Sequence, residues 1–415
     1  MGHIEDRWYA PQRDGNGKPV LNGRGKPVMQ PTDLHGKGQR YRVRYIAPDG
    51  KERSQSFPDR QKKAAEDFLV TTETSKLRGA YVDPRAGRVT FRQYADDWLK
   101  DQTFEETTRE SVEQRFRTHL HPYFGDRALI QIEPSTVRAW DRGLQVKKVA
   151  PAYRRVLFAL LSTVLSAAVD DERIVKNPCS AKSVKAPKVP VRRIVPWPAA
   201  QVNAMREGLP ERYRIAVDLA AGCGLRQGEV FGLGVNDVDF LRGVVHVVRA
   251  VRTIRGTLAY GPPKGDKVRD VPLPESVAER LAAHIVRLPP LEVTMPWRTL
   301  DGKPTTVPLL LHTRELRACN RNHFNRHVWA NARTKVGIAA DYHNGMHALR
   351  HFYASVLLDA GESIKALSEY LGHSDPGFTL RTYTHLMPAS ESRTRKAVDK
   401  ALRNVDPPAD GLATA

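Results

Sequence analysis

The spacing of apolar residues divides the chain into a segment of short strands, a helical segment and a segment that mixes helices and strands. Residues 1–38 contain few apolar positions and many Gly, Pro, Asn and Asp residues, a composition that predicts a flexible arm. In residues 39–85, apolar and polar positions alternate over Arg40–Tyr45, which predicts a strand. An Asp-Gly turn follows, and Lys51–Phe57 is expected to form the returning strand. Apolar residues then have helical spacing over Gln61–Leu77. This order predicts a small ββα module.

Helical spacing of apolar residues continues through residues 88–180. A capping-box pattern from Thr90 to Gln93 opens the first helix, and Pro151 opens the longest one. The apolar stripes predict four helices, which suffice for a small all-α domain. The next segment, residues 181–195, contains prolines that discourage regular structure, and we interpret it as a linker.

Residues 196–403 combine both kinds of spacing and predict an α+β domain. The strands are expected at Val244–Val251, Thr257–Tyr260 and Val268–Leu273. The helices are expected at Glu211–Ala221, Ser276–Leu288, Asn322–Val336 and Met346–Ala360. Residues 404–415 are expected to form a disordered tail. The chain is therefore predicted to be a multidomain protein with a ββα module, an all-α domain and an α+β domain.

The charge balance indicates the kind of partner. The 415 residues contain 66 Lys and Arg against 46 Asp and Glu, which gives a net charge of +20 at pH 7. This excess favours a polyanionic partner, with nucleic acid as the first candidate and an anionic membrane as the second. No apolar run reaches the length of about eighteen residues that a membrane span needs, and the first residues lack an apolar signal region. We therefore expect a cytoplasmic protein that does not act on a membrane.

Two basic segments are candidate DNA contacts. Arginines alternate along the first predicted strand and share one face that could enter a groove: Arg40, Arg42 and Arg44. The predicted linker has five basic residues and no acidic residue up to residue 193: Lys182, Lys185, Lys188, Arg192 and Arg193. The alternatives are a solvated basic hairpin and an ordinary basic linker, because charged runs are commonly surface features.

The first residue with candidate chemistry is Arg226. It lies in the sequence G-L-R-Q-G-E at 224–229, a tight turn that enters a helix, where backbone N–H groups and the helix dipole favour an anion. Lys264 lies in P-K-G-D-K at 263–267, a turn between two predicted strands from which a lysine can reach into a groove. Each residue alone is more typical of a solvated surface. Either one supports an anion-binding site only in combination with the C-terminal residues described next.

A second group of candidate residues lies near the C-terminal end. His347 and Arg350 are three positions apart and share a helix face. His373 ends an L-G-H sequence, and Tyr383 follows ten residues later. Two arginines and two histidines can bracket a phosphate, since the guanidinium fork matches phosphate oxygens. A tyrosine beside them is a candidate covalent nucleophile, provided that positive neighbours or a base activate its phenol. The group predicts attack on a phosphodiester.

Histidines 343, 347 and 351 are spaced by four, a spacing that also occurs in metal sites. Asn344-Gly345 marks the expected helix start and leaves His343 outside the helix, and no carboxylate or cysteine joins the set. The cysteines are scattered and show neither metal-ligand nor disulfide spacing: Cys179, Cys223 and Cys319. We therefore expect no metal or other cofactor, and we expect the cysteines to be buried thiols.

These motifs, in this order, resemble the tyrosine recombinases, and in particular the integrases of phages and other mobile elements. The family pattern is G-L-R-x-G-E, a hairpin lysine, H-x-x-R, L-G-H, and T-x-x-x-Y-x-H. The corresponding residues here are Arg226, Lys264, His347, Arg350, His373 and Tyr383. Gly265 stands where the family commonly has Thr, so Lys267 remains the alternative to Lys264.

The resemblance implies a metal-independent mechanism. Tyr383 would attack the scissile phosphate, form a 3′-phosphotyrosyl link and free a 5′-hydroxyl. Arg226, Arg350 and His373 would bind the non-bridging oxygens. Lys264 would protonate the leaving 5′-oxygen, and His347 would assist proton transfer from the phenol.

The resemblance also implies the partners of a recombination reaction. These are double-stranded DNA attachment sites, three further copies of the chain in a homotetramer on DNA, a directionality factor and a host DNA-bending protein. It further implies an arm-binding module, a core-binding domain and a catalytic domain. The alternatives are a type IB topoisomerase, which the separate N-terminal modules disfavour, and a non-catalytic DNA-binding regulator, which would have no use for the nucleophile.

Overall fold

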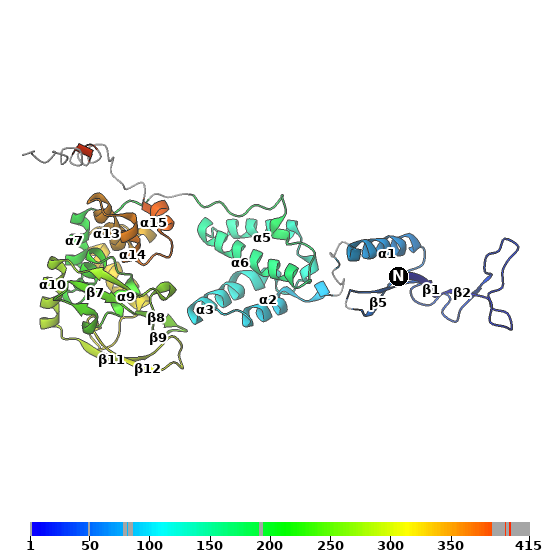
Figure 1. The fold of residues 1–415 in the computed structure, drawn as a ribbon, viewed down its shortest axis with the longest axis horizontal. Coiled ribbons are helices and arrows are strands. Elements are labelled where there is room, and N and C mark those ends of the chain that lie inside the picture. Colours follow the sequence, from blue (N-terminus) through cyan, green and yellow to red (C-terminus); the bar gives the residue numbers. More distant parts are fainter. Residues whose placement is uncertain are drawn as a thin grey trace, which may run out of the picture. The chain divides into compact units, whose positions relative to one another are not determined.

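The computed structural model of the chain describes residues 2–48, 50–77, 81, 86–190, 194–383, 395 and 398–399. It divides into two compact units, residues 1–103 with 112–190 and residues 104–111 with 191–415 (Figure 1). The predicted tail over 404–415, Arg192, Arg193 and Asp49 of the predicted turn lie outside the described residues.

The N-terminal module is a three-stranded antiparallel sheet covered by one helix. Its elements are β1 (His3–Asp6), β4 (Tyr41–Ile46), β5 (Glu52–Phe57) and α1 (Lys62–Leu77), with β4 in the centre of the sheet. Alternate positions of β4, namely Tyr41, Val43 and Tyr45, are buried and form a core with Ala65 of α1. This alternation is the pattern that predicted the strand.

Residues 1–38 depart from the flexible arm that their composition predicts. Strand β1 pairs with β4 from His3 opposite Arg44 to Asp6 opposite Tyr41, and β2 (Tyr9–Pro11) pairs with β3 (Met29–Pro31). In the turns between β2 and β3, Asp14 and Asn22 accept hydrogen bonds from backbone N–H groups two and four residues later. Backbone pairing and these turns order the segment with few apolar side chains, so its low apolar content was a poor guide.

The helical domain has the predicted kind of structure. Its helices are α2 (Phe91–Lys100), α3 (Glu106–Arg115), α4 (His121–Phe124), α5 (Pro134–Val146) and α6 (Pro151–Asp170), with a π-helical turn at Phe116–Leu120. The expected cap is present, since Thr90 Oγ1 accepts from the backbone N–H of Gln93 at 3.3 Å. The rings of Phe91, Phe116 and Phe124 are buried.

Among the described residues one helix, α6, is long and apolar enough to cross a membrane by length and composition alone. It buries Leu157, Leu161 and Val164 within the helical domain, and its Arg154 pairs with Asp141 of α5 at 2.8 Å. These contacts are those of a core helix.

The second unit contains the α+β domain. Its helices are α7 (Ala199–Gly208), α8 (Glu211–Gly222), α9 (Gln227–Phe231), α10 (Glu275–Arg287), α11 (Arg321–His323), α12 (Ala330–Lys335), α13 (His347–Asp359), α14 (Ile364–Leu371) and α15 (Pro376–Tyr383). Its strands are β6 (Val238–Asp239), β7 (Val244–Val247), β8 (Ala250–Ile254), β9 (Thr257–Gly261), β10 (Arg269–Pro272), β11 (Leu291–Pro296) and β12 (Pro304–Leu309). All strand pairs are antiparallel within this described part: β6–β7–β10, β8–β9 and β11–β12.

Two features of this unit differ from the expected elements. The predicted strand Val244–Val251 is two strands, because β7 pairs with β10 while β8 pairs with β9, and Arg249 at the break forms an ion pair with Asp237. The β11–β12 hairpin was not predicted. Leu291, Val293 and Met295 of β11 do alternate with polar residues, but β12 begins with Pro304 and lacks such alternation.

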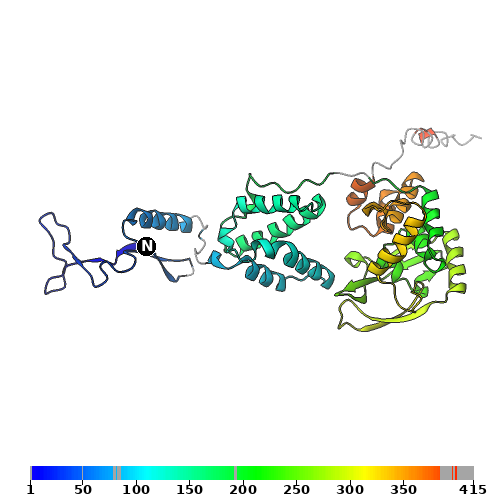
Figure 2. The same ribbon diagram turned by 180° about the vertical axis from the view of Figure 1, so that it is seen from behind.

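The C-terminal helices complete the unit around α8, a helix buried among α7, α10 and α13. Both ribbon views place α13, α14 and α15 together at one end of the unit (Figures 1 and 2). Ser363 caps α14 by accepting from Ala366 N at 3.1 Å, and Gly372 ends it in the left-handed conformation. These two caps set the direction in which the chain enters and leaves the L-G-H sequence.

Candidate active site

A buried carboxylate, Glu229, fixes the first arginine. Arg226 caps α9, and the Glu229 carboxylate accepts from its backbone N at 2.8 Å and from Nη1 at 2.9 Å. The same carboxylate binds both terminal nitrogens of Arg269, at 3.1 and 2.7 Å. Burial alone would raise the pKa of Glu229, but the hydrogen bonds and charge of Arg269, with the charge of Arg226, lower it to about 2. Glu229 is therefore ionised and holds Arg226 in one orientation.

Backbone carbonyls from two motifs hold the second arginine. Arg350 is 1% exposed, and it donates from Nη1 to the carbonyl of Gly224 at 2.7 Å and from Nη2 to the carbonyl of Leu371. Arg226 Nη2 donates to the next carbonyl, that of Gly372, at 3.1 Å. The G-L-R and L-G-H sequences, about 147 residues apart, thus meet around two guanidinium groups.

Gly224 makes this approach feasible. Its φ of +64° lies in the left-handed region, and a Cβ there would lie 2.4 Å from the ring of Tyr353. The turn before Arg226 can therefore pack closely against α13 only with glycine at this position.

His373 joins Arg350 to a buried polar chain. Its Nε2 accepts from Arg350 Nη2 at 3.2 Å, since a guanidinium nitrogen can only donate, and its Nδ1 therefore carries the proton toward Thr379 Oγ1 at 2.6 Å. Burial, followed by the charges of Arg350 and Arg226, lowers the pKa of His373 to about 3. In this state His373 is a neutral ring.

The candidate nucleophile is almost fully enclosed. Tyr383, at the end of α15, is 1% exposed, and its Oη lies 2.8 Å from Nδ1 of His351. Burial raises the pKa of the phenol, and the charges of Arg350 and Arg226 oppose that rise only in part. The phenol is therefore protonated in this state, and both arginines are close enough to act on its charge.

His347 lies at the first position of α13 beside these groups. His347 is exposed to solvent, yet desolvation by the surrounding protein, then the charges of Arg350, Arg226 and neighbouring cations, lower its pKa to about 4. Its ring meets that of His351 edge to face, with centroids 4.6 Å apart. His347 is therefore uncharged at neutral pH and contacts the residue that binds the phenol.

The two lysines of the predicted hairpin differ in their contacts. Lys267 Nζ donates to the carbonyl of His373 at 2.9 Å, whereas Lys264 is exposed and makes no hydrogen bond with the described residues. The charge of Lys264 nevertheless contributes to the lowered pKa of His347. Both lysines are thus close to the cluster, one engaged and one free.

The structure therefore brings together all six residues that the motifs identified, and it adds residues that the motifs did not assign. Glu229 was visible three positions after Arg226, and His351 was visible one helical turn after His347, but it was weighed only as a metal ligand. Arg269 carried no local signal. Among the described residues, no three His, Cys, Asp or Glu side chains are grouped as a metal site.

The arginines predicted to contact DNA in the N-terminal module differ in their partners within that module. Arg40 pairs with Asp6 at 2.8 Å and Asp59 at 3.0 Å, and Arg44 pairs with Glu5 at 3.2 Å. These arginines thus hold the sheet of their own module together, while the buried Nε of Arg42 has no hydrogen-bond partner among the described residues.

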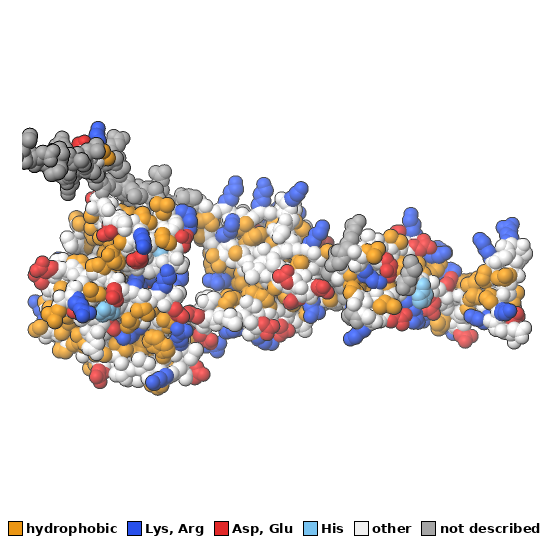
Figure 3. All heavy atoms as spheres, viewed as in Figure 1, with side chains coloured by type: hydrophobic (Ala, Val, Ile, Leu, Met, Phe, Trp, Pro, Cys, Tyr) orange, Lys and Arg blue, Asp and Glu red, His pale blue; other side chains and the backbone are white. Residues whose placement is uncertain are grey.

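The first part of the predicted linker packs on the helical domain instead of hanging free. Val184 and Pro187 are buried, and Arg138 Nη1 donates to Ser183 Oγ at 2.7 Å. Lys182, Lys185 and Lys188 are exposed at every third position. Lys and Arg side chains project along this domain's upper edge in Figure 3, as expected for a face that meets phosphates.

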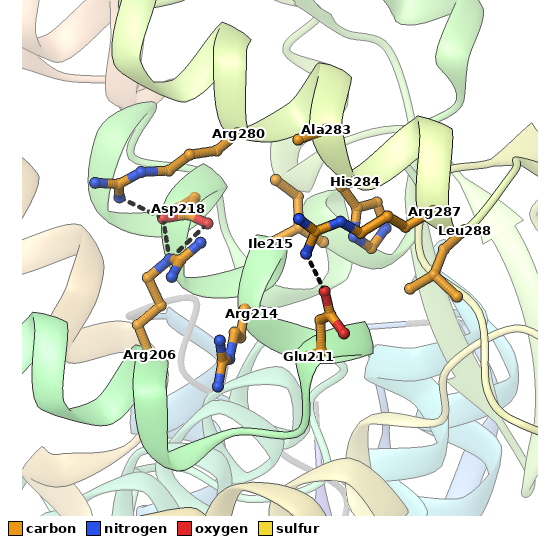
Figure 4. Close-up of a pocket in the computed structure, with 10 residues that line it drawn as sticks. All are labelled: Arg206, Glu211, Arg214, Ile215, Asp218, Arg280, Ala283, His284, Arg287 and Leu288. Atoms are coloured by element: carbon orange, nitrogen blue, oxygen red, sulfur yellow. Dashed lines mark hydrogen bonds and ion pairs between the residues drawn. The ribbon is translucent and has the colours of Figure 1, made fainter.

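A separate pocket lies between α8 and α10 (Figure 4). It is rich in arginine, but Asp218 binds Arg206 at 2.9 Å and Arg280 at 2.8 Å, and Glu211 binds Arg287. With Glu207 on Arg214, each arginine of this pocket has a carboxylate partner. The three cysteines lie elsewhere and are buried free thiols, as expected.

Comparison with known proteins agrees with this fold. Residues 199–390 match the phage integrase family, and residues 90–144 match the N-terminal SAM-like domain of phage integrases. A putative prophage phiRv2 integrase of Mycobacterium tuberculosis is 26% identical over 368 residues, covering 86% of this chain and 91% of the relative. A tyrosine recombinase XerA of Thermococcus kodakarensis is 30% identical over 224 residues, covering 53% and 67%.

Solved structures of integrases on DNA share the fold. A Tn1549 transposon integrase in complex with a circular intermediate DNA superposes with a TM-score of 0.62 at 20% identity, covering 75% of this chain and 99% of that one. A lambda integrase tetramer bound to a Holliday junction gives a TM-score of 0.52 at 18% identity, covering 80% and 93%.

The fold and the site define the class: the protein is a tyrosine recombinase, an enzyme that recombines DNA at specific sites. Within that class, the chain belongs to the phage integrase family. The resemblance and the multidomain fold predicted from the sequence are confirmed, and DNA is the partner.

Proposed function

We propose that this integrase cleaves and rejoins DNA through a 3′-phosphotyrosyl link on Tyr383, and so integrates and excises a phage or other mobile element. The observation that carries the proposal is the cluster of Arg226, Arg350 and His373, in which the arginines donate to the carbonyls of residues 224, 371 and 372. Tyr383 is near enough to both arginines for their charges to lower the pKa of its phenol.

The arginine pair would bind the non-bridging oxygens of the scissile phosphate. Both guanidinium groups are held by the protein before any substrate arrives, so only an exchange of hydrogen-bond partners is needed before they stabilise charge on the pentavalent phosphorus. Arg350 is held by carbonyl groups and a ring nitrogen, weaker partners than a phosphate oxygen. A phosphate can therefore compete for its N–H groups.

His373 would change its role when the phosphate binds. In the free protein its Nε2 accepts from Arg350 and cannot donate. A phosphate that draws Arg350 away would free Nε2, and its negative charge would raise the lowered pKa of the ring. His373 would then take up a proton and donate from Nε2 to a phosphate oxygen.

Lys264 would protonate the leaving 5′-oxygen, and Lys267 would position the His373 backbone. Lys264 has no hydrogen bond within the described structure and can swing toward the substrate, whereas Lys267 is engaged with the His373 carbonyl. His347 would assist proton transfer from the phenol.

The assembly and the domain roles complete the proposal. Four protomers would exchange strands on two duplexes, as the lambda integrase tetramer on a Holliday junction suggests by its shared fold. Residues 39–85, with Arg40, Arg42 and Arg44, would bind arm-type sites, and residues 88–180 would bind the core site. The linker over 181–195, with Lys182, Lys185, Lys188, Arg192 and Arg193, would follow the phosphates between the core-binding domain and the catalytic domain over 196–403. A directionality factor and a host DNA-bending protein would act with it in the cytoplasm.

A nicked suicide substrate tests the nucleophile. The full-length protein should form a covalent adduct that maps to Tyr383, while Tyr383→Phe should bind the DNA equally well and form no adduct. Tyr370→Phe is the matched control, because this neighbouring phenol packs against the hydrophobic core, and it should keep the adduct. An adduct that persists in Tyr383→Phe would place the nucleophile elsewhere.

A sulfur substitution separates the two lysines. A 5′-bridging phosphorothiolate leaves as a thiolate and needs no proton donor, so it should restore cleavage to a variant that lacks the general acid. Lys264→Ala is expected to cleave the sulfur substrate far better than the normal one, while Lys267→Ala should be slow on both. The reverse result would assign the acid to Lys267.

A further inference from the structure

His351 makes the direct contact with the candidate nucleophile. It lies one turn after His347 on α13, and its Nδ1 is 2.8 Å from Tyr383 Oη, with the ring centroids 5.6 Å apart. Within the described residues, the Tyr383 hydroxyl makes no other hydrogen bond. His347, to which the family resemblance assigns help with the phenol proton, contacts the ring of His351 instead, at 4.6 Å.

The direction of this hydrogen bond follows from the protonation states. Burial raises the pKa of the Tyr383 phenol, so its oxygen carries a proton and donates. The Nδ1 atom of His351 must then accept, which places the ring proton on Nε2. A neutral imidazole with a free lone pair aimed at the phenol is the arrangement that proton abstraction needs.

The surroundings of His351 keep this ring neutral. Burial, then the charges of His347, Arg350 and His343, lower its pKa to about 3. These groups face it from α13 and from the turn before α13, and Tyr383 faces it from α15. Histidine 351 is therefore neutral throughout the neutral range. A bound phosphate would offset the nearby positive charges and raise this pKa, which would make the ring a stronger base for the phenol proton.

We propose that His351 positions the Tyr383 hydroxyl and accepts its proton during strand cleavage. The step balances as follows: the Oη–H bond breaks and its proton moves to Nδ1, Oη forms a bond to phosphorus, and the bond from phosphorus to the 5′-oxygen breaks. The leaving oxygen takes a proton from the lysine. Rejoining returns the proton from His351 to the phenol, so the ring is unchanged after a full cycle.

The inference rests on the proposed function, because it takes Tyr383 as the nucleophile. It assigns the contact with the phenol to a residue that the family pattern leaves unassigned. His347 then acts on the phenol through the edge-to-face contact with His351, or on the phosphate beside the arginines.

Two substitutions separate positioning from proton transfer. The Asn side chain places an oxygen near the position of Nδ1, so His351→Asn keeps an acceptor for the phenol but removes the base, whereas His351→Ala removes both. The measurement is the rate of adduct formation on a nicked substrate between pH 7 and 8.5, with full-length protein and saturating DNA.

The wild-type rate should vary little over this range, since a ring with a pKa of about 3 is already neutral. We expect His351→Asn to be slower by roughly 10²-fold and its rate to rise about tenfold per pH unit, because hydroxide must then take the proton. Added imidazole should accelerate His351→Ala. His246→Ala is the control, because this partly exposed histidine pairs with Asp270 on the neighbouring strand, and it should cleave at the wild-type rate.

A His351→Asn protein with the wild-type rate and pH profile would overturn the inference, and so would a slow variant whose pH profile is unchanged. Failure of the proposed function gives a different result, an adduct that still forms in Tyr383→Phe. The experiments therefore distinguish a wrong base from a wrong nucleophile.

Discussion

Two arginine-rich places in the second unit differ in how their charges are balanced. In the pocket of Figure 4 each arginine has a carboxylate partner; the pairs are Arg206–Asp218, Arg280–Asp218, Arg214–Glu207 and Arg287–Glu211. In the candidate active site Glu229 pairs with Arg226 and Arg269, whereas Arg350 has carbonyl groups and His373 as its described partners. In the pocket three carboxylates pair with four arginines, whereas in the candidate active site one carboxylate lies beside three arginines and leaves a larger excess of positive charge.

The difference shows in the titration of neighbouring groups. Burial, then the charge of Arg226, lowers the pKa of Arg350 to about 9, and the same arginines help to lower the pKa values of His347 and His373 to about 4 and 3. A buried charge without a counter-charge is costly, and an arriving phosphate removes that cost. Arginine content alone therefore does not identify an anion site; the missing carboxylate does.

The largest effect should come from the arginine that lacks a carboxylate. Arg350→Lys keeps a charge but loses the rigid fork, and we expect strand cleavage to fall by roughly 10³-fold, as when a preorganised oxyanion donor is lost. Arg280→Ala, in the pocket, should cleave within about twofold of wild type, because Asp218 keeps Arg206 as partner. The measurement is single-turnover cleavage of a nicked substrate.

Thermal unfolding of both variants shows whether the loss reflects chemistry or folding. If Arg280→Ala lost as much cleavage as Arg350→Lys while both remained folded, the distinction between the two places would fail.

The bridging carboxylates give the next contrast. Glu229 and Asp218 each bind two arginines and are each 2% exposed in their side chains. Glu229→Gln leaves Arg269, whose side chain is 7% exposed, without a carboxylate partner and should destabilise the fold by about 3–5 kcal/mol. Asp218→Asn should cost less, because Arg206 also pairs with Glu207 and Arg280 is 48% exposed. Only Glu229→Gln should also slow cleavage in the protein that remains folded, because only Glu229 orients Arg226.

The pH dependence of unfolding checks the Glu229 pair independently. Its folded pKa of about 2 lies below the ordinary value of 4.5, so the carboxylate contributes stability above pH 4.5 that declines as the pH falls toward 2. Glu229→Gln should lack that part of the decline. An unchanged acid-unfolding curve in this variant would mean that the pair does not hold the folded state together.

The sequence predicted those parts of the site that depend on short spacings. Arg226, His347 with Arg350, and His373 lie in local motifs whose helix starts and ends are set by neighbouring residues. The partners that orient them could not be predicted, because Arg269 reaches Glu229 across 40 positions and His351 reaches Tyr383 across 32. Such contacts depend on how α13, α15 and β10 pack, which no local pattern records.

The fold shows the same division between local and distant information. Strand β4 and helix α1 carry a clear periodicity and were predicted within one residue of their observed bounds. Strand β1 has no such pattern, since it is held by pairing with β4 and by the ion pair of Asp6 with Arg40. The linker prolines predicted a segment without regular structure but gave no sign that Val184 and Pro187 are buried.

The smallest expected effect is proton uptake when DNA binds. His373 is neutral in the free protein at pH 6, because its pKa is about 3. A phosphate between the arginines cancels part of their charge and raises that pKa, so binding should take up as much as about one proton at pH 6 and less as the pH rises toward 8. Affinity for DNA should therefore weaken as the pH rises through this range, beyond the effect of the linker lysines.

Calorimetric titration of a Tyr383→Phe protein with core-site DNA, in buffers of different ionisation enthalpy, measures the uptake without cleavage. Adding His373→Asn should abolish it. Adding His284→Gln should leave it intact, because His284 contacts the carbonyl of Leu310 in the pocket between α8 and α10. Proton release, or uptake that survives in His373→Asn, would show that the positive charge of the active site does not control the pKa of His373. The contrast between the two arginine-rich sites would then lose its electrostatic basis.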